Sequence, residues 1–99
     1  MAQIKPNEIV IAVLQNPREK VIGVLHEVNA SGVFIRGIDL NAFEDFTQAI
    51  VRSEQFFGMS DCFFPMWRIE RITNDESSMD LPSMQEQFTR RTGLKLEDF

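Results

Sequence analysis

Three segments in the first half of the chain, residues 8–14, 20–28 and 33–38, are rich in Ile and Val. Successive side chains of a β-strand point to opposite faces, so each of these segments is apolar on both faces if it forms a strand. In the first segment, for example, Ile9 and Val10 are neighbours that point to opposite faces and are both apolar. Such strands must be covered on both sides, and no other feature of the sequence constrains the fold as strongly.

Short polar turns connect the three segments. Pro17 presets the backbone for a turn over residues 16–19, and residues 29–32 form a second turn that ends at Gly32. Short connections favour antiparallel neighbours, so the segments predict a three-stranded antiparallel meander. The alternation divides the second segment into Ile22, Val24 and Val28 against Val21 and Leu25, and the third into Val33 and Ile35 against Phe34 and Ile38.

Each apolar face of this meander needs a cover. Burial of apolar surface contributes about 25 cal/mol per Å² to the stability. A face left in contact with water would therefore lose several kcal/mol, which is comparable to the stability of a whole domain. The cover can come from closure of the sheet into a barrel, from an amphipathic helix, or from a second copy of the chain. The shortness of the chain favours a contribution from self-association.

An amphipathic helix is predicted to follow the meander. Asn41 is expected to cap its N-terminus, with Glu44 three residues later as in a capping box, and Gly58 is expected to end it. Its apolar side consists of Phe43, Phe46, Ile50 and Phe57.

The remaining chain predicts two short strands that meet at Pro65, or one edge strand, within residues 61–74. Residues 73–82 are polar and predict a loop. Ser83 is expected to cap a short helix that ends at Gly93, followed by a docked or frayed tail. The whole chain is therefore interpreted as a single domain, mainly β with a helical insertion (α+β).

Composition and charge narrow the setting. The chain has 99 residues, 43% of them apolar and 25% charged, which suits one folded domain. A single cysteine excludes an internal disulfide, and no signal peptide or long apolar segment is evident, so we expect a cytoplasmic protein without a membrane partner. The net charge of −5 argues against non-specific attraction to phosphates.

Residues that could carry catalysis are sparse. His26 is the only histidine and has no second metal ligand close in sequence, so a partly buried or interface role is expected. Cys62 lies beside two Phe residues and is interpreted as a small apolar residue. Glu44 and Asp45 diverge by about 100° on a helix, and Asp75 and Glu76 lie in a polar stretch. The sequence thus predicts no catalytic residue, no metal site and no cofactor.

An apolar block near the fourth strand is the strongest candidate for function. It can be plain core, or it can be a subunit interface, because Trp, Phe and Met are enriched at interfaces. The block consists of Phe63, Phe64, Met66 and Trp67.

Between residues 8 and 72 the pattern resembles the SH3-like small barrels, and among them the Sm-like proteins. Residues 22–25, with Gly23 permitting a bent strand, are similar to the family's first motif, and Asn29 and the apolar residues 33–35 follow. The resemblance implies a small antiparallel barrel with the helix inserted between the third and fourth strands. It also implies ring-forming self-association through the fourth and fifth strands.

RNA-binding members of that family stack a base on an aromatic or His side chain beside an Asn in the loop after the second strand. Here that loop, residues 29–32, contains Asn29 but no aromatic or His side chain. The favoured hypothesis is therefore a non-enzymatic, self-associating small-barrel module that acts by binding. The alternatives are an Sm-like RNA binder that uses Asn29, Arg68 and Arg71, and a subunit with a composite inter-subunit enzyme site.

Overall fold

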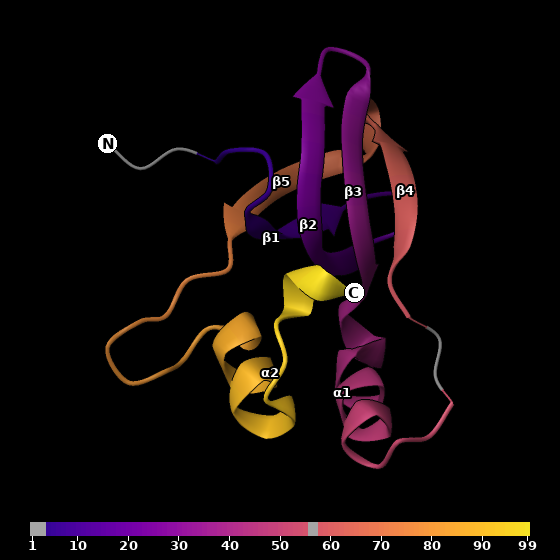
Figure 1. Ribbon diagram of the computed structural model, residues 1–99. Coiled ribbons are helices and arrows are strands. Elements are labelled where there is room, and N and C mark those ends of the chain that lie inside the picture. The colour runs from indigo at the N-terminus through magenta and orange to yellow at the C-terminus, as the bar shows by residue number, and fades with distance from the viewer. Residues whose placement is uncertain (1–3, 56–57) are drawn as a thin grey trace.

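Five antiparallel strands form one sheet in the computed structural model, which describes residues 4–55 and 58–99 (Figure 1). The order of the strands across the sheet is β4-β3-β2-β1-β5, so β4 and β5 are its edges. The strands are β1 (Ile9–Leu14), β2 (Glu19–Asn29), β3 (Gly32–Asp39), β4 (Ser60–Pro65) and β5 (Ile69–Asn74). The predicted meander and the α+β class are confirmed.

The chain between β4 and β5 turns at Pro65 through a 3₁₀ helix, η2 (Met66–Arg68). Two α-helices lie at the lower end of the sheet in Figure 1, namely α1 (Phe43–Val51) and α2 (Met84–Thr92). Two further 3₁₀ turns are η1 (Leu40–Ala42), which precedes α1, and η3 (Leu96–Asp98), which follows α2. The helix between β3 and β4 stands where the resemblance predicts an insertion. No helix among the described residues is long and apolar enough to cross a membrane.

Two glycines allow β2 and β3 to approach closely. Gly23 lies opposite Gly37, and a Cβ atom added to Gly23 would come within 2.2 Å of the carbonyl oxygen of Arg36 and 2.5 Å of the Gly37 Cα. No larger side chain fits at position 23 without a backbone shift. Gly23 thus permits the close approach of β3, and its expected role in bending β2 stays a prediction.

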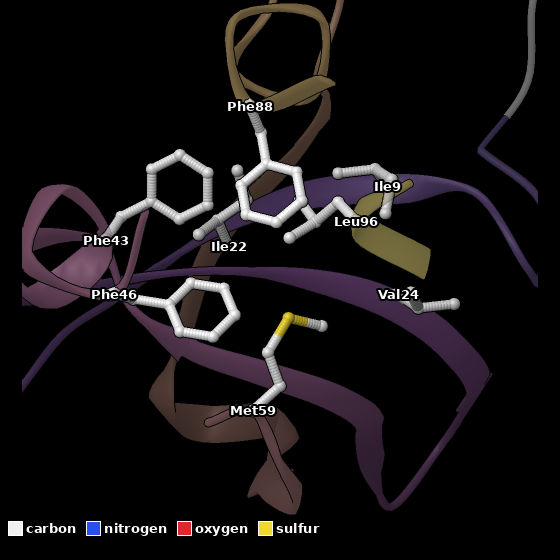
Figure 2. Packing of buried hydrophobic residues seen from close by; sticks show 8 residues of the cluster. All are labelled: Ile9, Ile22, Val24, Phe43, Phe46, Met59, Phe88 and Leu96. Carbon is white, nitrogen blue, oxygen red and sulfur yellow. The ribbon is translucent and has the colours of Figure 1, made fainter. Parts of the chain in front are cut away.

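Each face of the sheet carries a buried core, as the alternation of the strands predicts. On one face the rings of α1 and α2 cover residues of β1 and β2 (Figure 2). This first core contains Ile9, Ile22, Val24, Phe43, Phe46, Met59, Phe88 and Leu96.

The second core lies on the opposite face. It contains Val10, Ala12, Leu14, Val21, Leu25, Val33 and Ile35. Residues from both edge strands pack against it, Cys62 and Phe64 from β4 and Ile69 and Ile72 from β5. Because the two edges share one cluster, the sheet is curved around it. Within the described residues β4 and β5 are not paired with each other, so the sheet is not closed into a barrel.

A β-bulge in β2 overturns one predicted face. Leu25 lies opposite Ile35 and Glu27 lies opposite Phe34, so His26 is an extra residue in the ladder. The bulge shifts the alternation by one position, and Val28 comes to lie opposite Val33 of the second core. The prediction that Val28 shares a face with Ile22 and Val24 is therefore wrong.

The N-terminus of the first helix also differs from the prediction. The Asp39 carboxylate, and not the Asn41 side chain, accepts the first free backbone N–H, that of Asn41, at 2.8 Å. The chain then passes through η1 before α1 begins at Phe43.

The predicted C-terminal end of that helix is too late. α1 ends at Val51, because Ser53 adopts a left-handed conformation with φ of 56°. Gly58 is thus not the stop, and Phe57 lies outside the described residues.

The C-terminal part follows its local signals. The Ser83 hydroxyl accepts from the backbone N–H of Glu86, and Gly93 ends α2 with φ of 74°. The tail is docked and not frayed, because Leu96 is fully buried and the Phe99 ring packs edge-on against Phe46 and Phe88.

Candidate interaction surface

An exposed pair of aromatic rings lies beside the free edge of the sheet. Phe34 of β3 and Phe63 of β4 are directly opposite each other, and their ring centroids are 4.7 Å apart. Both side chains remain in solvent, with exposed fractions of 40% for Phe34 and 43% for Phe63. Such a pair gains from its mutual contact but leaves a wet apolar surface.

Polar groups border this pair on the same side of the sheet. Asp61 Oδ1 lies 3.2 Å from Arg36 Nη1 and 3.5 Å from His26 Nε2. An open concavity of about 540 Å³ is lined by His26, Glu27, Phe34, Asp61, Cys62 and Phe63. We call the group of His26, Phe34, Asp61 and Phe63 the aromatic surface.

The outer edge of β4 carries backbone groups that no strand of residues 4–55 or 58–99 pairs with. The N–H of Met66 donates to the carbonyl of Ser31 at 2.9 Å, and no register shift interrupts the β3–β4 ladder. Hydrogen-bonding residues alternate along an antiparallel strand, so residues 62 and 64 also point their backbone groups at β3. The backbone N–H and C=O groups of Asp61 and Phe63 therefore point away from β3, towards the open edge.

The predicted apolar block is divided between core and surface. Phe64 packs on the second core, as the core interpretation expects. Phe63, Met66 and Trp67 are exposed, and Trp67 is the most exposed of them at 63%. Neighbouring residues of a strand face opposite sides, which explains why Phe63 and Phe64 differ.

Trp67 has a fixed backbone under its exposed ring. Its carbonyl accepts from Gln15 Nε2 at 2.8 Å, and the Gln15 N–H donates to the carbonyl of Arg68 at 2.8 Å. Together with the Met66–Ser31 bond, these contacts attach η2 to the two turns that flank β2.

The residues of the RNA hypothesis have different environments. Asn29 uses its side-chain oxygen to accept from the N–H of Ser31 at 2.8 Å and its amide nitrogen to donate to Glu27 at 3.0 Å. Arg68 donates to the carbonyls of Gln15 and Pro17, whereas Arg71 is exposed on β5. Asn29 and Arg68 thus serve different turns, and each side chain already has intramolecular partners.

One carboxylate of each adjacent acidic pair, Glu44 and Asp75, has partners within the chain. Glu44 binds Arg91 through both of its oxygens at 2.8 Å, and the Asp75 carboxylate accepts from the N–H groups of Met84 and Gln85 at the start of α2. The hydrogen bond from Arg91 and then that from Gln48 lower the pKa of Glu44. Across residues 4–55 and 58–99, no group of three or more His, Cys, Asp or Glu side chains is placed to hold a metal ion.

The sequence missed Phe34 as part of this surface. The alternation of residues 33–38 places Phe34 and Val33 on opposite faces. In the structure, the helices cover the face of Phe34 only at the end of the sheet near α1 and α2 (Figure 1), and Phe34 remains exposed. A signal was present in the sequence, because Phe34 stands next to a turn, far from the helix that follows β3.

Compared with protein-family models, curated proteins and solved structures, the chain gives no match.

Proposed function

We propose that this protein is a non-enzymatic, self-associating small-barrel module that acts by binding or assembly. The observation that carries the proposal is the position of Phe34 and Phe63, exposed aromatic residues beside a strand edge that no other described strand pairs with. An apolar edge strand is a template for pairing with another chain.

The small-barrel description is supported by the curvature of the sheet. Both edge strands pack on the second core, and η2 connects them at one end. On this proposal the curved sheet is a partly open barrel, and the gap lies between the two edge strands, β4 and β5.

The two cores do not require a second copy of the chain. Helices cover part of one face of the sheet, and the curvature of the sheet encloses the core on the other, so each of the two cores is buried within one chain. The two edges of the sheet, however, differ in the side chains that they expose. β5 exposes Glu70 and Arg71, and such charges protect an edge strand from pairing. β4 exposes one charged side chain, Asp61, which lies 3.2 Å from Arg36 Nη1, and it exposes Phe63 in its middle.

Sedimentation velocity of the full chain, from low to tens of micromolar, tests the proposal. We expect the average mass to rise with concentration. Phe63→Glu should prevent this rise, because it places like charges in the contact. Leu81→Glu is the matched control, since Leu81 is also an exposed apolar residue but lies in the loop before α2. A wild-type chain that stays monomeric at tens of micromolar would overturn the proposal.

RNA binding is the second candidate, and the exposure of Trp67 is the observation in its favour. Base stacking on a free aromatic ring is worth about 1–3 kcal/mol per base. The net charge of −5 and the intramolecular bonds of Arg68 count against it. Trp67 is the only tryptophan, so its fluorescence reports contact directly.

We expect U-rich and A-rich RNA to leave Trp67 fluorescence unchanged at low salt. Quenching that weakens as salt is raised would favour the RNA candidate over assembly alone. The composite inter-subunit enzyme site stays a prediction, and a mass difference between native and denatured spectra would reveal a cofactor held in it.

A further inference from the structure

We infer that two copies of this chain pair through β4, antiparallel about a two-fold axis, with Phe63 of one copy opposite Phe63 of the second copy. This inference rests on the proposed self-association and specifies its geometry. The contact is isologous, since the same strand edge serves in both copies.

The backbone of β4 suits this arrangement. The N–H and C=O groups of Asp61 and Phe63 point to the open edge, as derived from the Met66–Ser31 bond. With Phe63 on the axis, the two Phe63 residues exchange both of their backbone hydrogen bonds. The N–H of Asp61 then donates to the carbonyl of Pro65 in the second copy, and the reverse contact follows by symmetry. Pro65 has no N–H, so only the Asp61 carbonyl remains with water.

The side chains of β4 suit the same register. Directly opposite residues of an antiparallel pair share a face, so Phe63 meets Phe63 and Asp61 meets Pro65. The Phe34 rings flank this central pair, because each lies against its own Phe63 at 4.7 Å. Asp61 meets no second charge across the axis, and its carboxylate already lies 3.2 Å from Arg36 Nη1 of its own chain.

The other edge of the sheet is a poorer partner for β4. The exposed side chains of β5 are Glu70, Arg71 and Thr73. Glu70 Oε2 is already 3.6 Å from Arg18 Nη1. A head-to-tail contact between β4 and β5 would bury Phe63 against charged or hydroxyl groups. The polarity of the two edges therefore favours β4 with β4 over the β4–β5 ring that the family resemblance implies.

A cysteine pair on the axis tests the geometry. In a Cys62→Ser background, which removes the only native thiol, Phe63→Cys places two thiols opposite each other across the axis. The Cα atoms of such a pair are about 5.5 Å apart, within disulfide range. We expect a disulfide-linked dimer under mild oxidation. Phe34→Cys is the matched control, because it is equally exposed on the same face but one strand further from the axis. Its Cα atoms would be about 15 Å apart, so no crosslink should form.

Amide exchange of the wild-type chain provides a second measurement that keeps Phe63 intact. The Asp61 and Phe63 amides should exchange about tenfold more slowly when about 90% of the chains are paired. The amides on the outer edge of β5 should not change with concentration. β4 protection together with the Phe63→Cys crosslink supports the inference.

Three results would overturn the inference. Self-association with both β4 and β5 protected indicates a head-to-tail ring, which leaves the proposed function standing. Protection of β4 without a Phe63→Cys crosslink rejects the two-fold register, and it also leaves the proposed function standing. A monomer at all concentrations rejects both the geometry and the proposed function.

Discussion

Arg68 connects η2 to the turn between β1 and β2. Its Nε donates to the carbonyl of Gln15 at 2.9 Å, and its Nη2 donates to the carbonyl of Pro17 at 2.8 Å. Its side chain is only 17% exposed. A guanidinium with two backbone acceptors in this setting holds a turn in place, and little of it remains available to a phosphate.

We expect Arg68→Met to lower the free energy of unfolding by about 1–3 kcal/mol, because it leaves two carbonyl acceptors without their partner. Urea unfolding measures the loss. Arg71→Met is the control, since Arg71 is exposed on β5 and its replacement should change stability by less than about 0.5 kcal/mol. Equal effects of the two substitutions would contradict the structural role of Arg68.

At the scale of elements, α1 and α2 are joined by rings on their inner sides and by one ion pair outside. Phe46 stacks on Phe88 with a centroid distance of 5.8 Å, and Arg91 Nη1 donates hydrogen bonds to both carboxylate oxygens of Glu44. The ion pair is largely exposed, so its contribution to stability is small. Its effect is clearest in the titration of Glu44.

Arg91→Met should raise the pKa of Glu44 towards the ordinary value for Glu, because the guanidinium is the main cause that lowers it. A carboxyl whose pKa is lower in the folded than in the unfolded state stabilises the fold above the unfolded pKa. That contribution is lost as pH falls through the folded pKa. The stability difference between wild type and variant should therefore vanish in acid.

A carboxyl-detected NMR titration of Glu44 measures the change. Arg90→Met is the control, because Arg90 pairs with Glu86 at 2.8 Å and not with Glu44. If the pKa of Glu44 stays unchanged in Arg91→Met, the ion pair does not form in solution.

At the scale of the whole molecule, the chain following α2 completes the first core. Leu96 and the Phe99 ring lie with Phe46 and Phe88, residues from elements far apart in sequence. The tail thus links both helices, and Arg36 of β3 reinforces it by donating to the Phe99 carbonyl at 2.8 Å.

Leu96→Ala should lower the free energy of unfolding by about 2–5 kcal/mol, the usual range for a buried leucine. Leu94→Ala is the matched control two residues away, because Leu94 is exposed and its truncation should be nearly neutral. Thermal and urea unfolding of both variants test the difference. Similar stabilities would show that the tail does not dock in solution.

Much of the architecture was predictable because its signals are local. Alternation along β1 and β3 assigned their faces correctly, and Ser83 and Gly93 marked the ends of α2. The predictions that were wrong depend on the local backbone conformation, which the pattern of side chains does not reveal. The bulge at His26 inverted the face of Val28, and the left-handed Ser53 ended α1 before Gly58.

By itself, the sequence determined that both faces of the sheet must be buried, since alternation of side chains is a property of each strand alone. Only the tertiary structure decided what buries them, which strands become edges and which apolar residues stay in solvent. Phe63 and Phe64 are adjacent and identical in chemistry, yet one is exposed and the other packs on the core. The reason is that exposure depends on neighbours brought together from distant parts of the chain, and no local pattern encodes them.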